Sequence, residues 1–176
     1  ISVTLPIYHG TDADTLEIGI GHLLGSSLPV GGESTHTILT AHSGMASQKM
    51  FSDLDKLQEG DVFYLHIFDE TLAYKVSRTD TVLPEDTSLL GIEPDKDMVT
   101  LVTCTPFGVN THRLLIRGER TDYTVVVEEA AASAETPDVG STWTEEYWKG
   151  IAIGVALLVL LMLIYYYIDS KETGKN

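Results

Sequence analysis

The sequence predicts a mainly β domain, built as a closed or nearly closed barrel with short helices on its connections and followed by a C-terminal transmembrane helix. Many short runs of β-branched and aromatic residues lie between Gly, Pro, Asp and Asn residues. Helical periodicity is confined to two brief segments. A long uncharged run near the C-terminus has the length of a bilayer-spanning helix. Together these observations indicate a strand-rich domain attached to a membrane.

The expected strands and helices follow the chain in order. Strands are predicted over 35–40, 61–68, 72–77, 98–104 and 112–117. The tripeptide DET between the second and third strands is short enough for a hairpin. Short helices are predicted over 12–19, which begins at the capping residue Asp12, and over 48–57, where apolar residues recur three and four positions apart.

The C-terminal part of the chain is expected to be a tether and a membrane anchor. Residues 128–148 hold six acidic side chains and no basic one, which is typical of a solvated tether. Residues 149–168 are predicted to form the transmembrane helix, because the run from 151 to 168 carries no charge and would be about 27 Å long as a helix. Aromatic residues flank this run on both sides, as an interfacial belt requires.

The positions of the lysines predict the orientation of this helix. Lys171 and Lys175 follow the run, whereas only Lys149 lies close before it. The positive-inside rule therefore predicts that residues 169–176 form a cytoplasmic tail and that residues 1–148 are extracytoplasmic. The chain begins without Met and without a signal peptide, so we expect an N-terminal portion to precede it in the natural protein.

Composition excludes several classes of function. The 26 acidic and 11 basic side chains give a net charge of -15, which repels phosphate backbones and argues against nucleic-acid binding. The single cysteine, Cys104, rules out an internal disulfide and a multi-cysteine zinc site. No histidine pair has the helical spacing of a zinc protease, and neither a metal nor another cofactor is expected.

Two interpretations of Cys104 remain open from the residues alone. It is either a small buried hydrophobe at a strand end or a nucleophile, which needs a proton-transfer partner and a group that holds the developing oxyanion. Thr105 and Pro106 stop the strand and place the sulfur at a rim. Arg113 lies on the strand that folds back beside it, where it either activates the thiol or pairs with a surface acid.

The choice of a partner histidine is also open at this point. His42 follows an apolar strand, the position at which β scaffolds present active-site residues. His36 and His66 lie within strands and are expected to hydrogen-bond on the sheet surface, whereas His9 and His22 are expected in solvated turns. Periodicity does not by itself select His42 among the six histidines.

Several segments in the same order resemble the sortases, the cysteine transpeptidases of Gram-positive cell surfaces. TLVTC followed by TPFGVNTHRLLIRG is similar to the family's strand, cysteine, loop and arginine signature. LPIYHGTD, GIGHLLGSSLPVGGESTHTILTAHSG and FSDLDKL followed by EGDVFY are similar to class C, the pilin-polymerising branch. The resemblance covers roughly residues 3–121. It implies an eight-stranded sortase barrel with Cys104 as nucleophile, His42 as acid and base, and Arg113 as transition-state stabiliser.

The same resemblance implies a reaction and partners. Cleavage of an LPxTG-type signal between Thr and Gly would give a thioacyl enzyme, which a lysine amine of another pilin resolves. Alternatives are a sortase that anchors proteins to peptidoglycan, a non-catalytic membrane-tethered pilin-binding domain, and a Cys-His hydrolase. Ser43 stands where relatives commonly have arginine, and nothing in this chain corresponds to the lid segment that class C members usually have.

Overall fold

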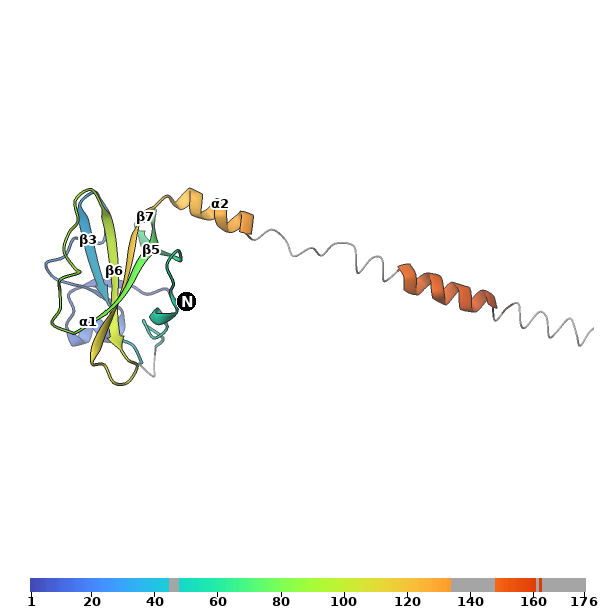
Figure 1. Cartoon of the computed structure of the whole chain (residues 1–176), viewed down its shortest axis with the longest axis horizontal. Coiled ribbons are helices and arrows are strands. Elements are labelled where there is room, and N and C mark those ends of the chain that lie inside the picture. The colour runs from blue at the N-terminus through green and yellow to red at the C-terminus, as the bar shows by residue number, and fades with distance from the viewer. Residues whose placement is uncertain (45–47, 134–147, 161, 163–176) are drawn as a thin grey trace, which may run out of the picture. The chain divides into compact units, whose positions relative to one another are not determined.

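The computed structural model describes residues 1–44, 48–133, 148–160 and 162 (Figure 1). Its folded part is one seven-stranded sheet in the order β1-β2-β3-β6-β7-β5-β4. The strands are β1 (Ile7–His9), β2 (Ile20–His22), β3 (Thr35–Thr40), β4 (Val62–Ile67), β5 (Glu70–Val82), β6 (Asp97–Thr105) and β7 (His112–Thr121). Contacts divide the chain into two units, Ile1–Ala130 and Ala131–Asn176, and the sheet belongs to the first.

The centre of the sheet brings together strands from different parts of the sequence. β3 runs parallel to β6, and β7 runs antiparallel to both β6 and β5. Because β6 and β7 have neighbours on both sides, their middle residues are buried: Val99 and Ile116 have no exposed surface. The core is completed by aliphatic and aromatic side chains from the other strands and from the segment after β3, among them Leu39, Met50, Leu54, Leu65, Leu72 and Tyr74.

The predicted strands are confirmed, with one difference in their number. All five lie at the predicted places, and β5 and β7 extend further than the apolar runs indicate. The expected closed barrel of eight strands is wrong in detail, since the described residues form seven strands with β1 and β4 at the two edges. The long connection 83–96 between β5 and β6 carries Pro84, Gly91 and Pro94 and forms turns instead of a further strand.

The two helix predictions have different outcomes. α1 (Ala13–Ile18) is confirmed, and the Asp12 side chain accepts a hydrogen bond from the Thr15 backbone N–H as an N-cap. The helix predicted over 48–57 is wrong, because its described part contains turns and one 3-10 helix, η1 (Leu54–Lys56). Met50 has a φ of 39°, which lies outside the right-handed helical region. The apolar residues of this segment are therefore buried in the core by turns instead of by a helix.

The segment predicted as a tether begins as a helix. α2 (Tyr123–Ser133) extends past the predicted domain end at residue 127, so the first residues of the predicted 128–148 tether are helical. The Val126 side chain is buried, and the Tyr123 ring packs edge-on against Tyr64 of β4. These contacts attach the start of α2 to the sheet. Residues 134–147 of the predicted tether lie outside the described residues.

The predicted membrane anchor is described only in part. Residues 148–160 and 162 are helical, and their apolar side chains from Ile151 to Leu160 are largely exposed. Within the part of the chain that the structure describes, no helix combines the length and the apolar character needed to cross a bilayer. The other residues of the predicted 149–168 span, and the predicted tail 169–176, lie outside that part.

Candidate active site at the ends of β3, β6 and β7

Cys104 and Arg113 face each other on neighbouring strands. In the antiparallel pair of β6 and β7, Cys104 is directly opposite Arg113, and Thr105 is opposite His112. Residues in such a position project from the same face of the sheet, with Cβ atoms about 4.5–5.5 Å apart. On its other side, Arg113 pairs with Val82 of β5. The predicted return of the second strand beside the first is therefore confirmed, and the pairing register places the guanidinium on the same face as the thiol.

His42 is brought level with Cys104 by the parallel pair of β3 and β6. The last pair in this ladder is Thr40 with Val102, and the Ala41 N–H then donates to the Val102 carbonyl at 3.2 Å. Continuing the same register places His42 opposite Cys104. The structure therefore brings the end of β3, followed by His42, next to the strand that carries Cys104, although a long stretch of chain separates His42 from Cys104 and Arg113.

Side-chain hydroxyls hold the chain on both sides of His42. The Thr103 hydroxyl donates to the Ala41 carbonyl at 2.8 Å, and the Ser43 hydroxyl donates to the Cys104 carbonyl at 2.8 Å. Thr103 is buried, whereas Ser43 and Cys104 are half-buried. These two hydrogen bonds are contacts that the sequence does not reveal: there, Ser43 is only a departure from the family pattern, and Thr103 has no assigned role.

A third hydrogen bond attaches His42 to the core. The Phe51 N–H donates to the His42 carbonyl at 3.0 Å, and Phe51 is buried. The Gly44 N–H donates to the Ser52 hydroxyl at 3.0 Å. The segment after β3 therefore leaves the sheet at His42 and is held by the turns that precede η1.

The loop after β6 holds the Arg113 guanidinium. The Arg113 Nη1 donates to the carbonyls of Asn110, at 3.3 Å, and His112, at 3.1 Å. The loop is itself closed by the N–H groups of Val109 and Asn110, which both donate to the Pro106 carbonyl at 3.0 Å. Within the described residues, the other guanidinium nitrogens of Arg113 make no hydrogen bond, so they remain able to bind a ligand oxygen.

The rim of this region is apolar and exposed. Phe107 and Val109 keep 69% and 64% of their surface in solvent, whereas Cys104, His42 and Arg113 are half-buried. The Phe107 ring lies against Gly44, where an added Cβ would be 3.0 Å from it. Phe107 therefore brings the loop that follows Cys104 against the turn that follows His42.

The histidines within β2 and β3 are buried and structural, which corrects the expectation for His36 and His22. His36 is 1% exposed and contacts the Gly91 carbonyl through Nδ1 at 2.8 Å and the Thr100 hydroxyl through Nε2 at 2.7 Å. Burial lowers the pKa of His36, since a charged imidazole is disfavoured away from water. His22 is 2% exposed and contacts the Ser27 carbonyl through Nε2 at 2.9 Å.

The other histidines are exposed or lie away from the thiol. His9 is exposed and stacks on His22, with ring centroids 5.1 Å apart. His66 is exposed, as predicted, and contacts the Thr71 hydroxyl at 3.0 Å. His112, on β7, contacts the neighbouring Thr111 hydroxyl at 2.9 Å and lies on the opposite face from Arg113. Only His42 combines the level of Cys104 with a half-buried, unstacked position.

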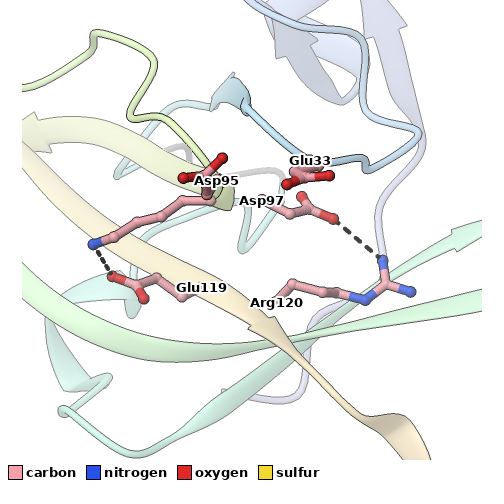
Figure 2. Close-up of a pocket in the computed structure, with 6 residues that line it drawn as sticks. Glu33, Asp95, Asp97, Glu119 and Arg120 are labelled. Carbon is pink, nitrogen blue, oxygen red and sulfur yellow. Dashed lines mark hydrogen bonds and ion pairs between the residues drawn. The ribbon is translucent and has the colours of Figure 1, made fainter.

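A cavity of about 320 Å³ lies at the opposite end of the sheet (Figure 2). Its residues are charged: Glu33, Asp95, Lys96, Asp97, Glu119 and Arg120. Lys96 forms an ion pair with Glu119 at 3.1 Å, and Arg120 forms one with Asp97 at 3.8 Å. Figure 2 labels Arg120 and Asp97 on the two sides of the second pair. Asp97 begins β6, whereas Cys104 lies near its end, so this cavity is remote from the thiol. The described residues contain no group of three or more side chains that would hold a metal ion.

Comparison with curated proteins finds sortases. A family model for the sortase domain matches residues 1–121. Sortase D of Bacillus subtilis (strain 168) is 33% identical over 123 residues, which cover 68% of this chain and 59% of that protein. Sortase A of Streptococcus agalactiae serotype III (strain NEM316) is 27% identical over 122 residues, covering 68% of this chain and 49% of that protein. The chain therefore spans only about half to three fifths of the length of these relatives.

Several solved structures of sortase C are similar to this chain. Sortase C-1 of Actinomyces oris is 55% identical, with a TM-score of 0.67, covering 68% of this chain and 66% of that one. Sortase C1 of Streptococcus suis is 50% identical, with a TM-score of 0.67, covering 69% and 68%. Sortase C of Streptococcus pneumoniae is 51% identical, with a TM-score of 0.67, covering 68% and 63%. The matched sheet, together with these similarities, shows that the chain belongs to the sortase family.

Proposed function

We propose that the chain is the catalytic part of a cysteine transpeptidase that cleaves an LPxTG-type sorting signal between Thr and Gly and joins the Thr to a lysine amine of another pilin. One observation supports the proposal: Cys104 and Arg113 are opposite each other in the pair of β6 and β7, and His42 follows the end of β3, which pairs with β6. A nucleophile, a proton carrier and a fixed cation are the groups that acyl transfer through a thioester requires.

In the first step, His42 holds the proton of the Cys104 thiol, and the sulfur attacks the carbonyl carbon of the substrate Thr. A carbon–sulfur bond forms, and the negative charge moves to the carbonyl oxygen. The Arg113 guanidinium donates hydrogen bonds to that oxygen from the nitrogens that face away from the loop carbonyls. His42 gives a proton to the Gly nitrogen as the carbon–nitrogen bond breaks, and the Gly-led remainder leaves as an amine.

In the second step, a lysine amine replaces the sulfur. His42 takes a proton from the incoming amine, whose nitrogen attacks the thioester carbonyl. The carbon–sulfur bond then breaks, His42 returns that proton to the Cys104 sulfur, and an isopeptide bond joins the two pilins.

The choice of pilins as partners is supported by the relatives. The crystal structure of Streptococcus pneumoniae sortase C, which is 51% identical to this chain, provides insight into pilin substrate specificity. Pilus-related sortase C of Group B Streptococcus is also 51% identical, with a TM-score of 0.66. We extend that substrate class to this chain because the matched region includes every proposed catalytic residue.

We further propose that the catalytic domain is extracytoplasmic and that residues 149–168 anchor it in the cell membrane, with the C-terminus in the cytoplasm. The support is the uncharged run from 151 to 168 and the lysines that follow it. Replacing two residues in the middle of this run with lysine would release the protein from the membrane fraction of cells. Retention of that variant in the membrane fraction would contradict the anchor.

The test of the proposed reaction uses the full chain, a fluorogenic LPxTG-type peptide and three acceptors. A thioacyl adduct on Cys104, found by mass spectrometry, supports the first step, and Cys104→Ala should remove it. A pilin added as acceptor should give a ladder of covalent polymers. Peptidoglycan-linked product without a ladder would favour a sortase that anchors proteins to the cell wall, and release into water despite abundant amine would favour a hydrolase. Absence of any Cys104 adduct would contradict the proposal.

A further inference from the structure

The backbone around His42 departs from the sheet at a defined hydrogen-bonding position. β3 and β6 are parallel, and the Ala41 N–H donates to the Val102 carbonyl. In a regular parallel ladder, donors recur two residues further along each strand, so the next donor would be the Ser43 N–H and its acceptor the Cys104 carbonyl. The structure keeps this acceptor but changes the donor, because the Ser43 hydroxyl donates to the Cys104 carbonyl at 2.8 Å.

We propose that Ser43 is a positioning residue, whose hydroxyl replaces a main-chain donor of the sheet and so fixes His42 beside Cys104. This inference rests on the proposed transpeptidase function. The hydroxyl lets the backbone turn out of the sheet at His42 without losing the connection to the strand that carries the nucleophile. The Thr103 hydroxyl, which donates to the Ala41 carbonyl at 2.8 Å, makes the corresponding connection on the other side of His42.

The two connections differ in burial, which separates their roles. Thr103 is 3% exposed, so its hydrogen bond contributes to folding as well as to the position of His42. Ser43 is half-buried, and its hydrogen bond joins a segment outside the sheet to the Cys104 carbonyl of β6. Loss of the Ser43 hydroxyl should therefore leave the fold intact and change mainly the relative position of the two reacting side chains.

A small displacement of His42 would slow the chemical steps more than it weakens substrate binding. Proton transfer requires His42 within hydrogen-bonding reach of the leaving and entering amines, and a misplacement of about 1 Å costs up to about a hundredfold in rate. Ser43 itself is not proposed to touch the substrate. The expected signature is thus a lower kcat with an unchanged KM, which separates positioning from binding.

The experiment compares Ser43→Ala and Ser43→Thr with a matched control, Ser26→Ala, in the full chain. Ser26 also donates its hydroxyl to a backbone carbonyl at 2.8 Å, that of Leu23, and it lies in the connection between β2 and β3. We expect Ser43→Ala to lower kcat for the fluorogenic peptide by about tenfold, with KM changed less than about twofold. Ser43→Thr should recover most of the loss, and Ser26→Ala should keep the wild-type kcat.

The outcomes separate this inference from the proposed function. If the wild-type chain forms no thioacyl adduct, the proposed function fails, whatever Ser43 does. If the wild-type chain reacts and Ser43→Ala has the same kcat, Ser43 has no positioning role although the enzyme is a transpeptidase. An equal loss of kcat in Ser43→Ala and Ser26→Ala would also overturn the inference, because the Ser43 hydroxyl would then serve the fold. A loss in Ser43→Ala that Ser43→Thr does not repair would overturn it as well, because the loss would not then concern the hydroxyl.

Discussion

Cys104 and Arg113 lie directly opposite each other in the antiparallel pair of β6 and β7. The Arg113 guanidinium is held by the Asn110 carbonyl of the loop that joins these strands and by the His112 carbonyl at the start of β7, so its position depends on the loop that follows the cysteine strand. A cation fixed in this way needs little reorganisation when negative charge develops on a bound carbonyl, which is the condition for strong electrostatic stabilisation of a transition state.

Replacement of Arg113 should slow the reaction severely. We expect Arg113→Ala to lower kcat/KM for an LPxTG-type peptide by about a hundredfold, because the developing oxyanion loses its donor. Arg113→Lys should recover only part of this loss, since an ammonium lacks the planar fork of the guanidinium. Arg78→Ala is the matched control, because Arg78 lies on β5 in an exposed ion pair with Asp80. Activity of Arg113→Ala within about twofold of wild type would contradict its assigned role.

The contact between Gly44 and Phe107 should matter for turnover. Gly44 and Gly60 both have left-handed φ angles, +82° and +97°, so alanine at either position costs about 1 kcal/mol or more of stability. An alanine Cβ at Gly44 would also lie 3.0 Å from the Phe107 ring, whereas nothing lies within 4 Å at Gly60. We therefore expect both variants to be destabilised in urea and only Gly44→Ala to lose peptide turnover. Equal turnover in the two variants would show that Phe107 does not affect the site.

Acid should destabilise the fold through His36. Burial, assisted by the Arg117 guanidinium, lowers the pKa of His36 although the Gly91 carbonyl favours the charged form. In the unfolded chain, His36 has an ordinary pKa near 6.5 and therefore binds a proton at a pH where the folded chain keeps it neutral. The free energy of unfolding consequently falls as the pH drops below about 6.5 toward the lowered pKa of the folded state.

Urea unfolding between about pH 7 and pH 5 measures this effect. His36→Gln should reduce the dependence of the unfolding free energy on pH, because the variant has no group to protonate at that position. His66→Gln is the control, since His66 is exposed and contacts the Thr71 hydroxyl and the Tyr64 ring at the surface. The same pH dependence in His36→Gln and wild type would assign the acid sensitivity to other groups.

Close packing at Gly118 should make the centre of the sheet intolerant of a methyl group. A Cβ at Gly118 would lie 2.6 Å from the Phe63 ring and 3.0 Å from the Tyr74 Cβ. We expect Gly118→Ala to lower the free energy of unfolding by about 1–3 kcal/mol, the usual cost of overpacking a core. Gly91→Ala, where nothing lies within 4 Å, should be close to neutral in the same urea titration. A neutral Gly118→Ala would mean that the Phe63 ring moves without cost.

Local sequence signals predict much of this fold because they concern neighbours along the chain. The runs that became β3, β4 and β6 have alternating or continuous apolar residues that end at Gly, Pro, Asp or Asn, and the Asp12 cap lies at the start of α1 as predicted. The same reasoning failed at Met50, Phe51 and Leu54. Their helical spacing arises because the turns there bury them in the core, and burial by turns leaves the same pattern as burial by a helix.

The sequence by itself determined the pair of Cys104 and Arg113, because a short loop joins their strands and an antiparallel return puts nearby residues opposite each other. Only the tertiary structure decided which histidine lies at their level. His42 reaches Cys104 through the parallel pair of β3 and β6, whose contacts join residues 62 positions apart, as from Ala41 to Thr103. No local pattern encodes the register of such a pair. It is set by burial of Leu39 and Val99 in one core and by hydroxyl bonds that exist only once the strands have met.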